Sequence, residues 1–299
     1  MSEQQYLTSK PQAEARRVKA GRVMELTHPG PPRGPVLPRL DVQKLNRYLP
    51  RRHGIRIEIN GVLAGTPMAV PDAVTEFAIG WAFMNRFFSE PEQIGRTSAT
   101  ASHVSLMLDG GADLERLKYE AIGWIPRADQ AMGQDADVSE RRARSVAVMS
   151  ELDAIASSKA TFERFDRDGA KAGYLHAGLA TGDDVACIAR DLESSAAVAK
   201  VLGWALTSAC ERSESMLVVR GVLDVNVVEA ASRAGIPIVA TDAVPTVGAI
   251  EAADLCCVSI LGLAQSHRRG LFVDGGHLQE GRGLVEEISA ELAGIGITE

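Results

Sequence analysis

The chain is poor in aromatic residues and has no excess of positive charge, and both shortages limit its partners. Phe, Trp and Tyr make up 5% of 299 residues, and 32 Lys and Arg oppose 39 Asp and Glu, for a net charge of -7. Nucleic-acid binders generally need surplus Lys and Arg to displace counterions, and aromatic rings on which bases stack. We therefore expect no nucleic-acid partner, although this composition still allows a local anion site.

Cysteine is equally scarce. The chain has no C-x-x-C pair and no cysteine in its first 186 residues; its four are Cys187, Cys210, Cys256 and Cys257. This arrangement is unlike a disulfide framework or a Cys-rich zinc or iron–sulfur site. The six histidines form neither H-E-x-x-H nor H-x-E, which zinc hydrolases and deaminases use. We expect no metal site belonging to the protein itself.

Long apolar runs are also missing. A spanning helix needs roughly 18 or more consecutive apolar residues, and the sequence has no such run. The segment Met1–Gly21 is polar and mixed in charge, without the apolar centre of a secretory signal. These features predict a cytoplasmic protein that does not associate with membranes.

The common catalytic signatures are absent as well. There is no G-x-x-x-x-G-K-[ST] for phosphates, no G-x-G-x-x-G opening a helix, and no G-x-S-x-G elbow. Since no pattern supplies a nucleophile, a general base or a metal set, we assign no catalytic residue.

The sequence divides into three parts. Residues 1–50 include four prolines within His28–Pro35, which predicts an extended or poorly ordered arm. Residues 51–157 predict a small α+β unit, because apolar and polar residues alternate over Ile55–Ile59 and Asn60-Gly61 is a hairpin turn. The other elements expected in this unit are a helix over Ala73–Phe88 capped by Asp72, strands at Ala101–Leu108 and Lys118–Ile125, and a helix over Val138–Ser157.

Residues 158–299 have a different sequence pattern, in which short apolar strands alternate with helices. Strands are expected at Tyr174–Ala180, Met216–Arg220, Ile238–Thr241 and Cys256–Leu261, and helices at Asp191–Cys210, Val225–Ala234 and Val247–Ala253. Such alternation indicates βαβ units around a mixed, largely parallel sheet, and hence the α/β class.

In sheets of this class, ligands bind beyond the carboxyl ends of the strands. Three loops are expected there. The candidate ligand-binding residues in these loops are Arg220, Gly221, Asp242, Thr246, Leu263, Gln265, His267 and Arg268. Thr246 opens a helix whose N-terminus can bind an anion, and His267-Arg268-Arg269 is basic within an acidic chain. A phosphorylated or nucleotide-like ligand is one interpretation of these loops, and ordinary caps and turns are the other.

His176, within an apolar strand, is a further candidate for ligand binding. A lone histidine in such a strand is more commonly a hydrogen-bonded core residue. Both roles stay open at this point.

Several motifs resemble the FdhD/NarQ family of accessory proteins for molybdenum formate dehydrogenases. They occur in the family's order over about residues 55 to 275: Glu58–Gly61 with Met68–Asp72 and Glu76–Trp81, then Gly173–Leu179, Ala196–Gly203, Ala234–Pro237 and Ala243–Thr246. The resemblance implies a C-terminal half similar to the cytidine-deaminase-like fold, often in a homodimer. It also implies molybdenum bis-pterin guanine dinucleotide as bound cargo, and formate dehydrogenase or a related molybdoenzyme as partner.

The sequence also departs from the family pattern. Sulfur-transferring members carry a C-x-x-C pair between the two halves, whereas Pro126–Arg144 contains no cysteine. The family's basic "GRHN" is replaced by Glu193–Ala196, and its "GFxR" loop by Gly262–Gln265. A persulfide carrier needs a thiol, so sulfur transfer is doubtful and a cysteine desulfurase is only a secondary candidate partner.

Three functions therefore compete. The first is an accessory protein that binds the pterin cofactor or the apoenzyme during molybdoenzyme maturation. The alternative from another class is a non-catalytic structural subunit that reuses the family's fold. An unrelated nucleotide-modifying enzyme is the third, although the sequence nominates no reactive group for it.

Overall fold

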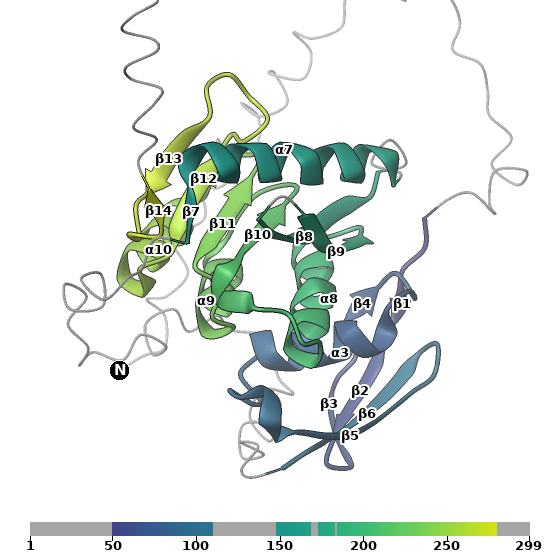
Figure 1. The fold of residues 1–299 in the computed structure, drawn as a ribbon. Helices are drawn as coiled ribbons and strands as arrows, with labels where there is room; N and C mark the ends of the chain where they lie inside the picture. Colours follow the sequence, from purple (N-terminus) through teal and green to yellow (C-terminus); the bar gives the residue numbers. More distant parts are fainter. Residues whose placement is uncertain (1–49, 110–147, 169–172, 183, 280–299) are drawn as a thin grey trace, which may run out of the picture. The chain divides into compact units, whose positions relative to one another are not determined.

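The computed structural model describes residues 50–109, 148–168, 173–182 and 184–279 (Figure 1). The expected arm, apart from residue 50, lies outside this part of the chain, as do the expected strand Lys118–Ile125 and the start of the expected helix Val138–Ser157. None of the helices in the described ranges is both long enough and apolar enough to cross a membrane.

A small sheet forms the first part of the described chain. Its strand order is β3-β2-β6-β5, and the side chains of Ile55, Ile57 and Ile59 are buried beneath it, as the alternation predicts. Asn60 and Gly61 make the β2–β3 turn with φ of 50° and 79°, the left-handed values that Asn-Gly turns adopt. The bounds are β2 Arg56–Ile59, β3 Val62–Gly65, β5 Ile94–Ala99 and β6 His103–Leu108, with a separate pair β1 His53–Gly54 and β4 Met68–Ala69 and a short 3-10 turn η2 Pro91–Gln93.

Helix α3, Val74–Met84, joins this sheet to the rest of the chain by packing against α8, Ser194–Thr207. The two helices meet at glycines. A Cβ on Gly80 would lie 1.8 Å from the carbonyl oxygen of Ala199, so only glycine allows this approach. Asp72 does not cap α3, contrary to expectation; the helix begins after Ala73, which has a φ of 47°, and the Asp72 carboxylate instead pairs with Lys200.

A six-stranded mixed sheet forms the second part, with strand order β13-β12-β11-β10-β8-β9. Its three neighbouring strands β10, β11 and β12 are parallel, and the flanking strands are antiparallel. The α/β class is confirmed, with the parallel part confined to these three strands. The bounds are β8 Leu175–Thr181, β9 Asp184–Asp191, β10 Ser215–Val219, β11 Ile238–Thr241, β12 Ser259–Gly262 and β13 Gly270–Val273, with a 3-10 turn η4 Arg212–Glu214 before β10.

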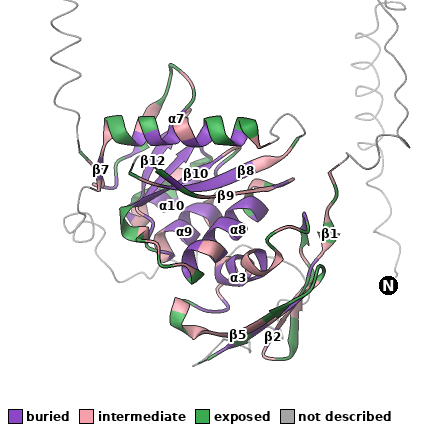
Figure 2. Cartoon of the chain, turned by 45° about the vertical axis from the view of Figure 1, so that its right-hand side comes forward, coloured by how far each residue is buried: buried purple, intermediate pink, exposed green. Residues whose placement is uncertain are grey.

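Helices cover both faces of this sheet (Figure 2). Helices α8, α9 and α10 share one apolar core with α3, and α7 packs on the opposite face through Phe162 and Phe165. The remaining bounds are α7 Glu151–Arg167, α9 Val225–Arg233, α10 Val247–Cys256, and the short parallel pair β7 Met149–Ser150 and β14 Leu278–Gln279. Burial on both faces explains why β10, β11 and β12 are almost continuously apolar.

Several sequence predictions differ from these elements. Strands β5, β9 and β13 are additional to those expected, and the helix expected over Val138–Ser157 begins only at Glu151, after the short strand β7. Helix α7 continues ten residues past Ser157 to Arg167, across the expected boundary between the two units. The expected strand Cys256–Leu261 is wrong at its start, because Cys256 ends α10 and Cys257 reverses the chain with a φ of 56° before β12 begins.

Candidate functional site

The candidate site lies at the carboxyl ends of β10, β11 and β12, where hydrogen bonds join the three loops expected there. The Gly221 backbone N–H donates to the Asp242 carboxylate at 2.9 Å, and the Leu263 N–H donates to the Ala243 carbonyl oxygen at 3.2 Å. Thr246 caps α10 by accepting from the Ala249 N–H, and its hydroxyl donates to a carbonyl of the first loop at 3.1 Å. Asp242 and Thr246 therefore hold the edge together.

Gly221 has a position that only glycine fits. Its φ is 112°, and a Cβ there would meet the Ser194 hydroxyl at 3.0 Å. The loop after β10 consequently turns tightly against the start of α8.

Arg220 lies beneath this edge with its charge already compensated. Its Nη1 donates to Asp166 at 2.8 Å, and its Nε lies 3.5 Å from Asp242. The guanidinium also lies over the rings of Phe162 and Phe165, at 5.7 and 5.6 Å from their centroids. A phosphate arriving here would have to displace a carboxylate, so Arg220 is poorly placed as a first contact.

His176 is fully buried in β8 and stacks on Phe165, with 5.1 Å between ring centroids. Its backbone oxygen accepts from the Arg220 N–H at 2.8 Å, which places it against the same edge. Burial lowers the pKa of its imidazole, opposed by the Asp168 carboxylate 3.5 Å from Nε2. The neutral ring is therefore favoured at pH 7, and His176 has no surface with which to touch a ligand directly.

Gln265, His267 and Arg268 form the exposed outer part of the site. The loop holds a defined turn, because the Arg268 N–H donates to the Ser266 hydroxyl and the Arg269 Nε donates to the Ser266 carbonyl oxygen, both at 3.0 Å. Within the described part of the chain, neither arginine forms an ion pair. An anion can therefore bind these two guanidinium groups without displacing a carboxylate from the described part of the chain.

The sequence interpretation missed the carboxylates that α7 brings to the edge. Asp166 and Asp168 lie in the last turn and at the end of this helix, beyond the expected end at Ser157. Asp168 also lies 3.5 Å from Arg190. These acids could be assigned to the site only once the helix was known to end at Arg167. The sequence carries no capping signal that shows where this helix ends.

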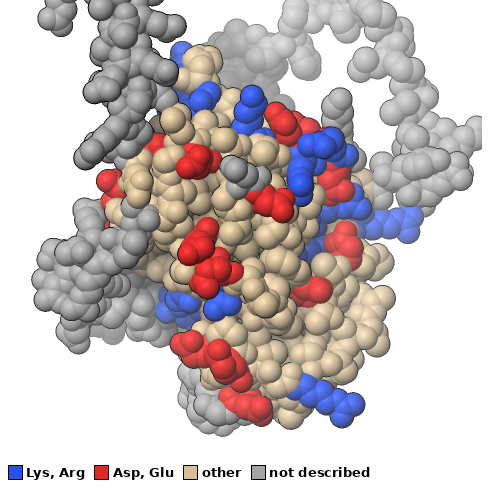
Figure 3. All heavy atoms as spheres, in the orientation of Figure 1, with Lys and Arg blue, Asp and Glu red and all other residues tan. Residues whose placement is uncertain are grey.

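A second ionic cluster lies between α3 and α8. Lys200 is buried, and its ammonium lies 3.1 Å from the buried carboxylate of Asp191 and contacts Asp72. Asp191 also accepts from the Val70 N–H at 2.8 Å. Because all of these groups are engaged, the cluster ties the first part of the chain to the second. Figure 3 shows acidic and basic side chains interspersed on one face, without a continuous basic area on its described surface.

A family model described as the FdhD/NarQ family matches residues 52–278. The chain belongs to the FdhD/NarQ family. The resemblance seen in the sequence is thereby confirmed.

Curated proteins called "Sulfur carrier protein FdhD" are similar to this family member. The one from Methanothermobacter thermautotrophicus is 25% identical over 226 residues, covering 73% of this chain and 86% of that protein. One from Anaeromyxobacter dehalogenans strain 2CP-C is 23% identical over 254 residues, covering 75% and 86%. A crystal structure described as a formate dehydrogenase accessory protein, from Desulfotalea psychrophila, aligns with a TM-score of 0.60 at 18% identity, covering 77% of this chain and 90% of that one. The structural likeness shows the shared α/β fold.

The four cysteines of this FdhD/NarQ family member are buried or partly buried. Burial raises the pKa of the Cys187 thiol in β9 to about 12, with smaller contributions from Glu76 and Cys210. Cys210 donates to the Ala205 carbonyl oxygen at 3.5 Å. A thiol with so high a pKa is almost entirely protonated at pH 7 and is a poor nucleophile. Across the described residues, no three His, Cys, Asp or Glu side chains gather as a metal site would require.

Proposed function

We propose that this protein is an accessory factor in molybdenum-cofactor handling, which assists the maturation of formate dehydrogenase or a related molybdoenzyme. Family membership supports the accessory role. The ligand part of the proposal rests on Arg268 and Arg269, which form no ion pair with another described residue and lie on a turn joined to the strand-end loops. In this proposal they receive a phosphate of molybdenum bis-pterin guanine dinucleotide, which the protein binds as cargo.

The proposal divides the candidate residues into two groups. Gln265, His267 and Arg268 are exposed and contact the ligand. Arg220, just after β10, and His176, on the neighbouring strand β8, support the strand-end backbone, since both are buried or already paired. The remaining candidates, which connect or shape the loops, are Gly221, Asp242, Thr246 and Leu263.

Sulfur transfer is not part of this function. The relatives are named as sulfur carriers. This chain, however, lacks the C-x-x-C pair of sulfur-transferring members, and the raised pKa of Cys187 keeps that thiol protonated. Cargo binding needs no thiol. A homodimer and a cytoplasmic location remain further predictions, and sedimentation analysis of the purified chain would test the first.

Binding of GDP, used as a probe for the dinucleotide end of the cofactor, tests the ligand site. Calorimetry at low and high salt should show binding that weakens with salt, and about tenfold weaker binding for R268Q/R269Q, since charge-assisted contacts are lost. R56Q removes one exposed arginine on the small sheet and serves as the control. Equal binding by R268Q/R269Q and the unmodified protein would exclude this loop.

A structural subunit of an enzyme complex is the second candidate. The compensation of Arg220 by Asp166 and Asp242 favours it, because Arg220 then offers no uncompensated charge to an anionic ligand. A stable stoichiometric complex with a molybdoenzyme, with no GDP binding and no retained pterin, would support this role and exclude the cargo site.

A further inference from the structure

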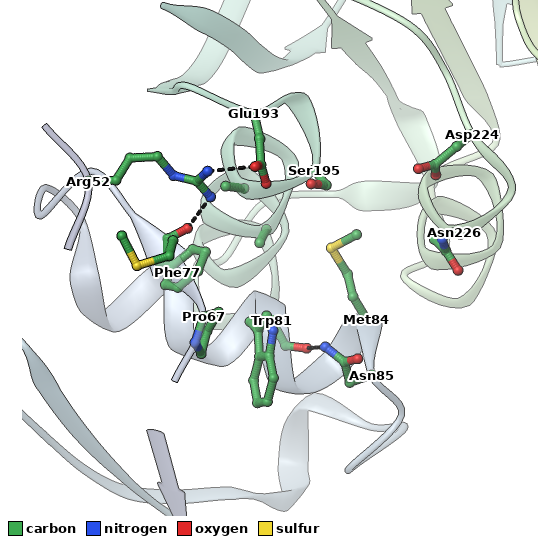
Figure 4. A pocket seen from close by; sticks show the side chains of 13 residues that line it. Arg52, Pro67, Phe77, Trp81, Met84, Asn85, Glu193, Ser195, Asp224 and Asn226 are labelled. Carbon is green, nitrogen blue, oxygen red and sulfur yellow. Dashed lines mark hydrogen bonds and ion pairs between the residues drawn. The ribbon is translucent and has the colours of Figure 1, made fainter. Parts of the chain in front are cut away.

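A cavity of about 220 Å³ lies between α3 and the starts of α8 and α9, where the loop after β10 ends (Figure 4). Its inner wall is apolar, formed by Phe77, Trp81 and Met84 from one side of α3. In Figure 4 the Met84 side chain extends from α3 into the space between the two other helices. This wall suits a hydrocarbon chain or the flat side of a ring.

The rim of the cavity is charged, and the charges do not cancel. Three charged residues line it: Arg52, Glu193 and Asp224. Arg52 donates to the Glu193 carboxylate at 2.5 Å, and its Nε lies 3.6 Å from the buried carboxylate of Asp191, so its positive charge is already engaged. The negative charge of Asp224 is uncompensated, because no basic side chain among the described residues pairs with it.

Asp224 keeps part of its hydrogen-bonding capacity free. Its Oδ1 accepts from the Val227 N–H at 3.0 Å and caps α9, which leaves its other oxygen for a ligand. The helix N-terminus contributes about half a positive charge, less than the full negative charge of the carboxylate. The cavity entrance therefore favours a cation, even though two helices start beside it.

The volume limits the size of the ligand. Pockets for drug-sized molecules are roughly 300–1,000 Å³, so this cavity accommodates little more than one large side chain. An apolar wall with a carboxylate at its mouth matches a short alkyl chain that ends in an ammonium or guanidinium group. Long basic side chains combine these properties, with an apolar stem and a charged head.

We propose that this cavity binds an alkylguanidinium or alkylammonium group, with the stem against Phe77 and Met84 and the charged head at Asp224. The group comes either from a Lys or Arg side chain of a partner polypeptide or from a free small amine. The site shares no residue with the ligand-binding residues proposed above, although Asp224 ends the loop after β10, so each proposal can fail by itself.

Nuclear magnetic resonance titration of the full chain with n-butylguanidinium tests the site, with uncharged n-butylurea as the matched probe. The guanidinium should shift signals of the cavity residues and bind at least about tenfold more tightly than the urea. D224N is the decisive variant, since Asn retains the cap of α9 while removing the charge. It should lose about tenfold in guanidinium affinity, whereas E214Q, an exposed acid outside the cavity, should lose none.

Two further measurements distinguish a partner polypeptide from a free amine and define the results that would contradict the proposal. An arginine-containing peptide that binds more tightly than n-butylguanidinium, and loses this advantage when citrulline replaces arginine, identifies a partner polypeptide; the reverse order identifies a free amine. S195F, which places a ring at the mouth of the cavity, should abolish either mode. Equal binding of guanidinium and urea, unchanged binding by D224N, or preferential binding of inorganic phosphate would overturn the proposal.

Discussion

Replacing glycine at the contact of α3 with α8 should separate the two helices. A Cβ on Gly80 would lie 1.8 Å from the Ala199 carbonyl oxygen, and one on Gly203 would lie 1.8 Å from the Glu76 carbonyl oxygen. Such contacts essentially do not occur below 3.0 Å. Both obstructing atoms are backbone, so no side-chain rotation relieves either clash, and the helix axes must move apart by roughly 1 Å.

Two effects of opposite sign determine the size of the loss. Overpacking a well-filled core costs about 1–3 kcal/mol, and sometimes more. Replacing glycine by alanine within a helix gains about 1 kcal/mol from backbone entropy and propensity. Because the clash here is with backbone on a fully buried face, we expect G80A and G203A each to be destabilised by about 2 kcal/mol or more. The double variant should lose less than the sum, since one separation relieves both clashes.

Urea denaturation followed by circular dichroism measures these changes. G248A is the matched control, because Gly248 lies in α10, has a negative φ, and a Cβ there would meet only Val225 at 3.8 Å. It should stabilise the protein by up to about 1 kcal/mol. If G80A were as stable as G248A, the close approach of α3 and α8 would be wrong, and with it the walls of the cavity.

Three other predictions concern ionisable groups. Cys187 has a pKa near 12 in the folded chain, so its thiolate fraction at pH 8 is roughly a thousandfold lower than in the unfolded chain, and its alkylation should be slower by the same factor. Mass spectrometry can follow the reaction, and equal rates in the two states would contradict the burial of this thiol. Because the pKa of His176 is lowered in the folded state, the unfolded state binds a proton more readily as the pH falls, and the free energy of unfolding should decrease below about pH 6.5. H176F should reduce this pH dependence, as urea titrations at about pH 5.5 and 7.5 can measure. K200M removes the ammonium beside the buried carboxylate of Asp191 and leaves it only Arg52, whose Nε lies 3.6 Å away, as a cationic neighbour among the described residues. The variant should therefore cost about 3 kcal/mol, the lower end for a broken buried pair, and K200M/D191N should recover part of it; a neutral single substitution would show that the cluster is dispensable.

The sequence predicts best where one face of an element is buried and the other is not. The alternation over Ile55–Ile59 and the Asn60-Gly61 turn correctly indicated the first hairpin, because local pattern and tertiary burial agree there. The sequence also predicts the parallel strands that contain Met216 and Ile238. Both are short apolar runs bounded by helix-capping residues, and their composition agrees with their burial on both faces.

Predictions failed where tertiary contacts outweigh local signals. Asp72 has the sequence context of a helix cap, but its carboxylate pairs with Lys200, a residue 128 positions away. Strand β9 has charged residues at its end, and Asp191 is buried there because Lys200 and the Val70 N–H compensate it. Cys256-Cys257 reads as strand by composition, although Cys257 has the left-handed backbone that ends α10. No single-sequence pattern encodes these partners.

The same limit explains why the sequence could not rank the basic residues of the candidate site. Arg220 and Arg268 both follow strands of the central sheet and look equivalent as phosphate contacts. Their surroundings differ, because α7 brings Asp166 against Arg220, while Arg268 stays exposed and unpaired within the described chain. An anion that binds Arg220 must replace an existing carboxylate, whereas one that binds Arg268 replaces only water, so the outer loop controls any first contact with an anionic ligand.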